Sequence, residues 1–130
     1  MQTQYSPAGT GPHDTRVLYS RAHSLLTQER FEDAAAFFRL MLILSPESER
    51  AWLGLGLCHE KRGQLAVARD LFLLGNAAKP SARCLVAAAR LFRQLDQDEL
   101  AQHHLERAVE VAEVNDESEL RHLALLELRN

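Results

Sequence analysis

Apolar residues recur at helical spacing from Asp14 to the end of this 130-residue chain. In the first such stretch they lie one, three or four residues apart, as in Val17, Leu18, Ala22 and Leu25. No segment shows the alternation of apolar and polar residues that is typical of a β-strand. The pattern therefore predicts an all-α protein, with seven helices within residues 14–130.

Short polar segments separate the predicted helices. Residues 45–47, Ser-Pro-Glu, offer a capping hydroxyl, a proline for the first helical position and an acid in the first turn, so a helix is predicted to start there. Residues 115–117, Asn-Asp-Glu, predict a similar start for the last helix, while Gly63 and Pro80 mark breaks between helices. Residues 1–13 combine proline and glycine with polar residues, which predicts a flexible N-terminal tail.

The same residue types return at intervals of about 34 residues. Ala34, Ala68 and Ala101 are 34 and 33 residues apart, and each is followed four residues later by a large apolar residue. A helix-turn-helix unit with this period is the tetratricopeptide signature, which predicts an α-solenoid of three repeats. The predicted repeats span about 15–48, 49–82 and 83–115, and a C-terminal capping helix with a polar outer face spans about 116–130.

The middle unit matches the repeat pattern most closely. It reads Trp52-x-x-Leu55-Gly56-x-x-His59, then Ala68-x-x-x-Phe72, then Pro80. His59 stands where tyrosine is usual. The small residues Gly56 and Ala68 are expected where the two helices of the unit approach each other closely, with larger side chains filling the space between units.

The charge balance excludes several classes of partner. With 18 acidic and 15 basic residues the net charge is −3, so no global positive field attracts nucleic acid or an anionic membrane. The first twenty residues lack the basic cluster and apolar run of a secretory signal, and no apolar stretch approaches the roughly 20 residues that span a bilayer. A cytoplasmic protein without direct membrane binding is therefore expected.

The chain offers little chemistry for catalysis or metal binding. Cys58 and Cys84 each lie among apolar residues and are expected to be buried free thiols, with a disulfide or a metal pair as the alternative. His103 and His104 are adjacent, so on a helix they point about 100° apart and cannot bind one ion together. We find no nucleophile elbow, phosphate loop or zinc-protease motif, and we expect no enzyme activity, metal or cofactor.

In a tetratricopeptide array the first helix of each unit lines the concave side, and its inner face falls on residues three or four apart. The candidate peptide-binding groove residues selected in this way are Tyr19, His23, Leu26, Arg50, Leu53, Leu57, Glu60, Arg83, Val86 and Arg90. Leu53, Leu57 and Val86 are apolar where the core of their own unit does not require it, which indicates a binding surface. Arg16, Arg50 and Arg83 recur with the period and are expected to form a ladder along one edge; a solvated charged face is the alternative.

Three segments carry a closer resemblance to a known family. They are residues 30–34 (RFEDA), residues 52–58 (WLGLGLC) with Gly63, and Pro80 followed by residues 87–91 (AAARL). Through them the segment from about Arg30 to Leu128 resembles the class II chaperones of bacterial type III secretion, which hold hydrophobic translocator proteins in the cytoplasm. The Leu-Gly-Leu-Gly-x-Cys stretch is the most specific element of the resemblance.

The resemblance implies that the concave groove takes an extended translocator segment with a Pro-x-Leu-x-x-Pro type of motif. The matching groove positions are Tyr19, His23, Leu26, Leu53, Leu57, Val86 and Arg90. The chain can be a monomer or a homodimer on this basis. A generic repeat adaptor or scaffold subunit of a larger complex is the alternative function, and an enzyme is the third hypothesis.

Overall fold

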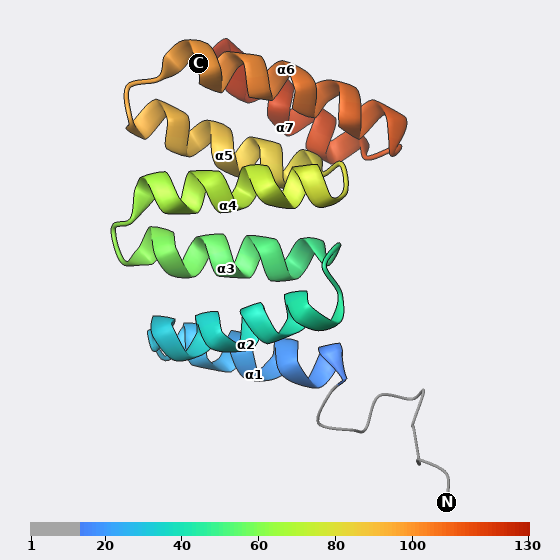
Figure 1. Cartoon of the computed structure of the whole chain (residues 1–130). Helices are drawn as coiled ribbons and strands as arrows, with labels where there is room; N and C mark the ends of the chain where they lie inside the picture. The colour runs from blue at the N-terminus through green and yellow to red at the C-terminus, as the bar shows by residue number, and fades with distance from the viewer. Residues whose placement is uncertain (1–13) are drawn as a thin grey trace, which may run out of the picture.

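The computed structural model describes residues 14–130, and the tail predicted for residues 1–13 lies outside them. The described part folds into seven α-helices without a strand, as the hydrophobic pattern predicts (Figure 1). The helices are α1 (Thr15–Thr27), α2 (Phe31–Leu44), α3 (Glu49–Lys61), α4 (Leu65–Ala78), α5 (Ala82–Gln94), α6 (Asp98–Val114) and α7 (Ser118–Arg129). The predicted all-α fold class is confirmed.

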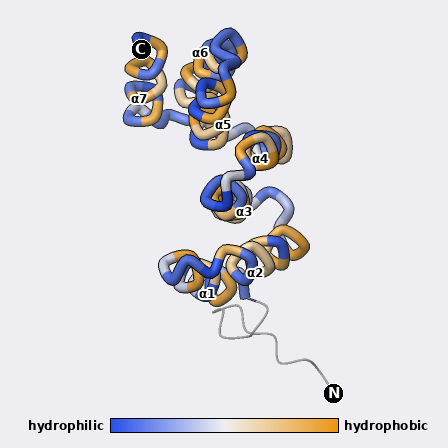
Figure 2. Tube along the Cα trace, turned by 90° about the vertical axis from the view of Figure 1, so that its left-hand side faces the viewer, coloured by the Kyte–Doolittle hydropathy of each residue, from blue (hydrophilic) through white to orange (hydrophobic). Residues whose placement is uncertain are grey.

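The helices stack in chain order from α1 to α7 (Figure 1). Each helix contacts the next one, and α3 and α5 also contact the odd-numbered helices on either side of them. The even-numbered helices of residues 14–130 make no contacts with one another. In an end-on view α1 and α7 project to the same side, with α3 and α5 set back between them (Figure 2). The odd-numbered helices therefore line the concave face of an α-solenoid.

Side-chain caps start the first three odd-numbered helices. Asp14, Ser48 and Ser81 accept hydrogen bonds from backbone N–H groups two or three residues ahead, over 2.7, 3.3 and 3.0 Å. The caps are 34 and 33 residues apart, so they follow the period of the repeat. The helix start predicted at residues 45–47 is wrong, because Ser45 ends α2 and Ser48 caps α3.

Four turns share one backbone conformation. Glu29, Gly63, Asp96 and Asp116 have left-handed φ angles of 60°, 79°, 59° and 56°. The residue after each of them donates its N–H to a carbonyl five residues back, over 2.8–3.0 Å, which satisfies the end of the preceding helix. The start predicted for the last helix at residues 115–117 is close to the observed one: Asp116 belongs to the turn that ends α6, Glu117 is the N-cap residue, and α7 begins at Ser118.

The hydrophobic core has two parts that meet between α3 and α4. The N-terminal part gathers buried side chains of α1, α2 and α3 around Phe38 and Met41. The C-terminal part gathers those of α4 to α7 around Phe72 and Leu105, with eight buried residues from α5 alone. Residues 14–130 thus form one continuous stack in which each helix is partly buried by its neighbours.

Glycines allow α3 to lie close to aromatic rings on two sides. A Cβ atom at Gly54 would overlap the Phe38 ring of α2, and one at Gly56 would overlap the Phe72 ring of α4. Because α3 and α4 form the middle unit, the expected close approach at Gly56 is confirmed, and Ala68 is fully buried in the same core as Phe72. The Leu-Gly-Leu-Gly stretch therefore has a packing role.

Candidate functional site

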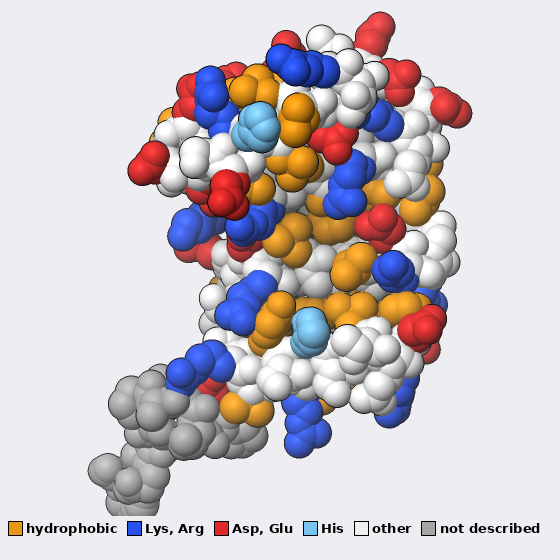
Figure 3. All heavy atoms as spheres, turned by 180° about the vertical axis from the view of Figure 1, so that it is seen from behind, with side chains coloured by type: hydrophobic (Ala, Val, Ile, Leu, Met, Phe, Trp, Pro, Cys, Tyr) orange, Lys and Arg blue, Asp and Glu red, His pale blue; other side chains and the backbone are white. Residues whose placement is uncertain are grey.

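Equivalent groove candidates recur along the odd-numbered helices, which line the concave face. Tyr19, Leu53 and Val86 share one position of the repeat, and His23, Leu57 and Arg90 share the position one turn later. Figure 3 views this face and shows a band of apolar side chains with basic and acidic side chains around it. All six residues come from α1, α3 and α5, the helices that line the concave side.

The apolar groove candidates differ in how deeply they are buried in the hydrophobic core. Leu53 and Leu57 are partly exposed on α3, although Leu53 also packs against the C-terminal part of the core. Val86 is only 5% exposed and belongs to that core. Part of this burial comes from outside the repeat of Val86 itself, because α7 packs against α5 beside it.

An aromatic cluster occupies the N-terminal end of the groove. The Tyr19 ring lies edge-on to Phe38 at 6.3 Å and 6.0 Å from the His23 ring, measured between centroids. The guanidinium of Arg50 lies 3.8 Å from the centre of the Tyr19 ring, a cation–π contact. Leu26 packs partly buried on the N-terminal core, and Glu60 of α3 is partly exposed. This end can therefore offer a ligand an aromatic surface with one positive charge held over it.

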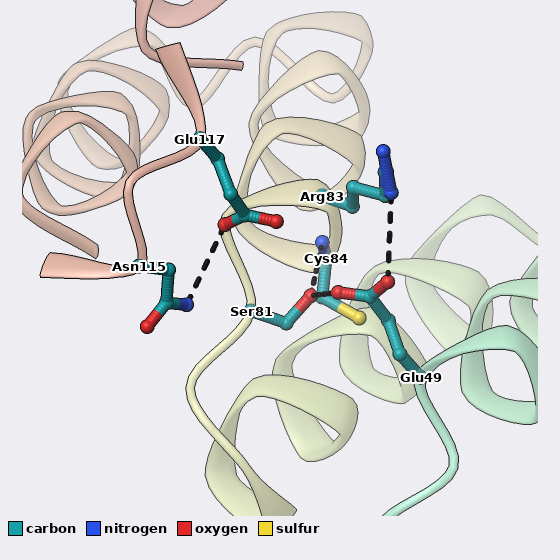
Figure 4. A network of polar contacts seen from close by, with 6 residues as sticks. All are labelled: Glu49, Ser81, Arg83, Cys84, Asn115 and Glu117. Carbon is teal, nitrogen blue, oxygen red and sulfur yellow. Dashed lines mark hydrogen bonds and ion pairs between the residues drawn. The ribbon is translucent and has the colours of Figure 1, made fainter. Parts of the chain in front are cut away.

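The periodic arginines all have local partners. Arg16 pairs with its helix cap Asp14 at 3.4 Å, and Arg83 pairs with Glu49 of α3 at 3.7 Å. The other carboxylate oxygen of Glu49 accepts a hydrogen bond of 2.6 Å from the Ser81 hydroxyl, which in turn caps α5 (Figure 4). With Arg50 over Tyr19, the three residues predicted as a ladder are each engaged within the protein.

A cavity of about 440 Å³ lies where the α2–α3, α4–α5 and α6–α7 connections come together, and most of its lining residues are polar or charged. Its lining comprises Glu47, Glu49, Lys79, Pro80, Ser81, Asn115 and Glu117, and Figure 4 shows most of them. Ser81 is buried but satisfied on both sides, since its hydroxyl binds Glu49 and the Cys84 N–H. Across residues 14–130 no buried side-chain polar atom lacks a hydrogen-bond partner.

The C-terminal end of the groove contains an apolar cavity of about 460 Å³ between α3, α5 and α7. It is lined by Leu53, Arg83, Val86, Ala87, Arg90, Leu120, Leu123 and Glu127. Four of these eight residues are among the groove candidates selected from the sequence, namely Leu53, Arg83, Val86 and Arg90. The structure therefore brings together candidates from α3 and α5, while Tyr19, His23 and Leu26 lie on α1, outside this cavity.

Sequence reasoning missed the contribution of α7, which was expected only to cap the array. Leu120, Leu123 and Glu127 form one wall of the cavity. Two contacts from Arg93 of α5 hold this wall in place, one of 3.2 Å to the Glu127 carboxylate and one of 2.6 Å to its carbonyl oxygen. The helix order contains the missing signal, because a helix that follows the second helix of a unit continues the concave row.

The two cysteines are free thiols inside the core, as predicted. Burial raises the pKa of the Cys58 thiol to about 11, with the charges of Arg39 and Arg62 acting in the opposite direction. Burial also raises the pKa of Cys84 to about 11, although its contact with Ser81 lowers it. Residues 14–130 contain no group of three or more histidine, cysteine or acidic side chains arranged to hold a metal ion.

A family model of the tetratricopeptide repeat matches residues 8–49 and 19–83, which together make up more than half of the chain. The chain therefore belongs to the tetratricopeptide repeat family. Arrays of this kind bind proteins on extended concave surfaces. None of the helices in residues 14–130 is long and apolar enough to cross a membrane.

Solved structures that resemble the chain include translocator chaperones of type III secretion. SycD of Yersinia enterocolitica superposes with a TM-score of 0.79 and 25% identity, over 92% of this chain and 90% of SycD. SycD with a peptide of the translocator YopD gives 0.68 and 25%, over 86% and 92%. PcrH of Pseudomonas aeruginosa gives 0.79 and 22%, over 93% of both chains. The resemblance to the translocator chaperones is thus confirmed.

A short stretch of the chain also matches a curated protein of another kind. It is 44% identical over 54 residues to the cell division cycle protein 27 homolog of Caenorhabditis elegans. The match covers 39% of this chain but only 7% of that protein's length. It is therefore a likeness between short segments.

Proposed function

We propose that this protein is a chaperone of a type III secretion system that binds an extended segment of a hydrophobic translocator in its concave groove. The observation that carries the proposal is the likeness, over about nine-tenths of the chain, to SycD, which has been solved with a translocator peptide. Binding keeps the translocator soluble and competent for export. The protein acts in the cytoplasm, without a cofactor, catalysis, nucleic acid or direct membrane contact, and as a monomer or a homodimer.

The physical basis is the instability of a free translocator. Its apolar segments aggregate or insert into a membrane prematurely unless a partner covers part of them reversibly. An extended peptide suits a concave groove because its side chains reach successive sites while the repeat array stays rigid. The ordering cost is then limited to the peptide itself.

The central subsite in this proposal is formed by Leu53 and Leu57. They lie one helical turn apart on α3, and both are partly exposed. The Tyr19 ring with Arg50 over it continues the surface toward α1, and the Val86 side chain forms part of the cavity toward α5. A leucine of the ligand can contact these apolar side chains while its neighbouring residues run along the groove.

The test is isothermal titration with a peptide that contains a Pro-x-Leu-x-x-Pro motif. Replacing Leu53 and Leu57 together by Glu places two charges in the central subsite, so we expect affinity to fall several-fold to a hundredfold, roughly 1–3 kcal/mol. Helicity and melting temperature are followed by circular dichroism. Because Leu53 also packs against the core, Leu57→Glu alone serves as a second variant.

A matched control places two glutamates on a helix that does not line the groove. Val67 and Leu74 of α4 are 45% and 52% exposed, so Val67→Glu/Leu74→Glu adds the same charge without reaching the concave face. This control should bind the peptide as wild type does. Unchanged affinity of the folded Leu53→Glu/Leu57→Glu variant would exclude binding at this subsite.

The alternative function is that of a generic adaptor or scaffold subunit, in keeping with the short match to a cell division cycle protein. An adaptor binds a partner that is already folded, whereas a chaperone binds an aggregation-prone segment. Co-purification from the native host separates the two functions. A secreted, membrane-active protein caught before export supports the chaperone, and a stably folded subunit supports the adaptor.

A further inference from the structure

The cavity at the C-terminal end of the groove combines an apolar floor with three charged side chains at its edge. The floor consists of Leu53, Val86, Ala87, Leu120 and Leu123. Arg83, Arg90 and Glu127 supply the charges. An apolar floor alone favours any large apolar side chain, so the charges decide what else the cavity selects.

Two of the three charges are neutralised by neighbouring helices. Arg83 pairs with Glu49 at 3.7 Å, and Glu127 pairs with Arg93 at 3.2 Å. Arg90 is exposed and makes no ion pair within residues 14–130. Helix α5 itself carries three arginines and no acidic residue, so Arg90 has no acidic neighbour one turn away on its own helix.

We infer that the cavity is a specificity subsite for an apolar side chain accompanied by an acidic side chain, and that Arg90 binds the acidic carboxylate. The inference rests on the proposed function and names the ligand chemistry that this end of the groove selects. Arg90, and not the periodic Arg50 or Arg83, is then the residue that recognises an acidic group of the ligand. Arg50 covers the Tyr19 ring and Arg83 is held by Glu49, so neither is as available as Arg90.

The geometry favours an acidic side chain within the ligand over a terminal carboxylate. Leu53 lines the cavity and also belongs to the central subsite with Leu57, one turn away. A helical turn rises 5.4 Å, which an extended peptide covers in about two residues. A ligand seated on the central subsite therefore needs only about two further residues to reach the cavity, where the side chain of an internal residue can supply the carboxylate.

The test uses 12-residue peptides with blocked ends and one Pro-x-Leu-x-x-Pro core. A single Glu is moved through the positions around the core, and each peptide has a Gln twin. With wild-type protein, we expect Glu to bind about threefold to tenfold more tightly than Gln at one or two adjacent positions. The preference should weaken in high salt, because a partly exposed ion pair is screened.

Arg90→Gln should remove the preference while leaving the affinity for the Gln twin unchanged, a separation that a merely structural role of Arg90 would not give. Arg107→Gln is the matched control, since it removes one positive charge from an exposed position of α6 and should keep the preference. Arg90→Glu should reverse it, so that a Lys peptide binds more tightly than its Gln twin at the same position.

The possible failures are distinct. Binding by wild type without a Glu preference at any position, or a preference that survives in Arg90→Gln, overturns the inference alone. A preference seen only with an unblocked C-terminal carboxylate also overturns it. If wild type binds none of the peptides, the proposed function and the inference fail together.

Discussion

Helices α3 and α5 occupy the same place in successive repeats and are packed in different ways. Each has 13 residues and a serine cap, and the caps lie 33 residues apart. Only five residues of α3 are buried, two of them glycines that face aromatic rings. Nine residues of α5 are buried, and four of these are alanines. The same backbone path is thus stabilised by different distributions of side-chain volume.

The difference follows from the neighbours of the two helices. Phe38 and Phe72 lie against α3, so α3 must leave room for their rings. Helix α5 packs against the alanine-rich face of α6 and is also contacted by α7. On the concave side, the equivalent residues Leu57 and Arg90 offer an apolar contact in one repeat and a charge in the next. Packing and binding therefore vary within one conserved geometry.

Exchanging the small residues of the two helices tests this comparison most strongly. Gly56→Ala should lower the free energy of unfolding by roughly 1–3 kcal/mol, because the added methyl group overlaps the Phe72 ring. Ala88→Gly in α5 should also destabilise, by about 1 kcal/mol, through helix propensity. Urea unfolding followed by circular dichroism measures both. A more stable Gly56→Ala variant, as helix propensity alone predicts, would contradict the close contact.

The buried thiols predict a loss of stability at alkaline pH. Cys58 of α3 and Cys84 of α5 have folded-state pKa values of about 11, above the ordinary value of 9.0. The unfolded chain therefore loses these protons first. The contribution is complete below pH 9 and is lost as pH rises toward 11, by about 1 kcal/mol for each thiol at pH 10.

Unfolding by urea at pH 8 and pH 10 measures this effect, and Cys58→Ala/Cys84→Ala is the control. The variant should be less stable at both pH values because of the volume it lacks, but its stability should fall less between them. An equal fall in wild type and variant would show that the thiols ionise as easily in the folded protein as in the unfolded chain.

The turns that end the two helices predict the smallest effect. Gly63 after α3 and Asp96 after α5 both have left-handed φ angles, which cost a residue with a Cβ atom about 1 kcal/mol. Gly63→Ala should therefore lower stability by about 1 kcal/mol, although its Cβ would meet no atom within 4 Å. Asp96→Gly should raise stability by up to about 1 kcal/mol. Thermal melts check both, and shifts in the same direction would contradict this explanation.

The sequence determined much of the fold, because a helix and its repeat period depend on local spacing. The helical spacing of apolar residues predicted seven helices, the 34-residue period predicted an α-solenoid, and residues such as Leu53 and Leu57 could be assigned to the helices that line the concave face. Helix starts were predicted less accurately. Residues 45–47 look like a start by composition, but Ser48 makes the capping hydrogen bond.

Only the tertiary structure decided which candidates are available to a ligand. Arg83 and Arg90 look alike in sequence and both are exposed, yet Glu49 from another repeat pairs with Arg83, whereas Arg90 makes no ion pair within residues 14–130. The burial of Val86 and the part that α7 takes in lining the groove could not be predicted from local spacing. Both depend on contacts between residues 30 or more positions apart in the sequence. Periodicity specifies the face of a helix, whereas charge pairing and burial depend on what the neighbouring helices bring to that face.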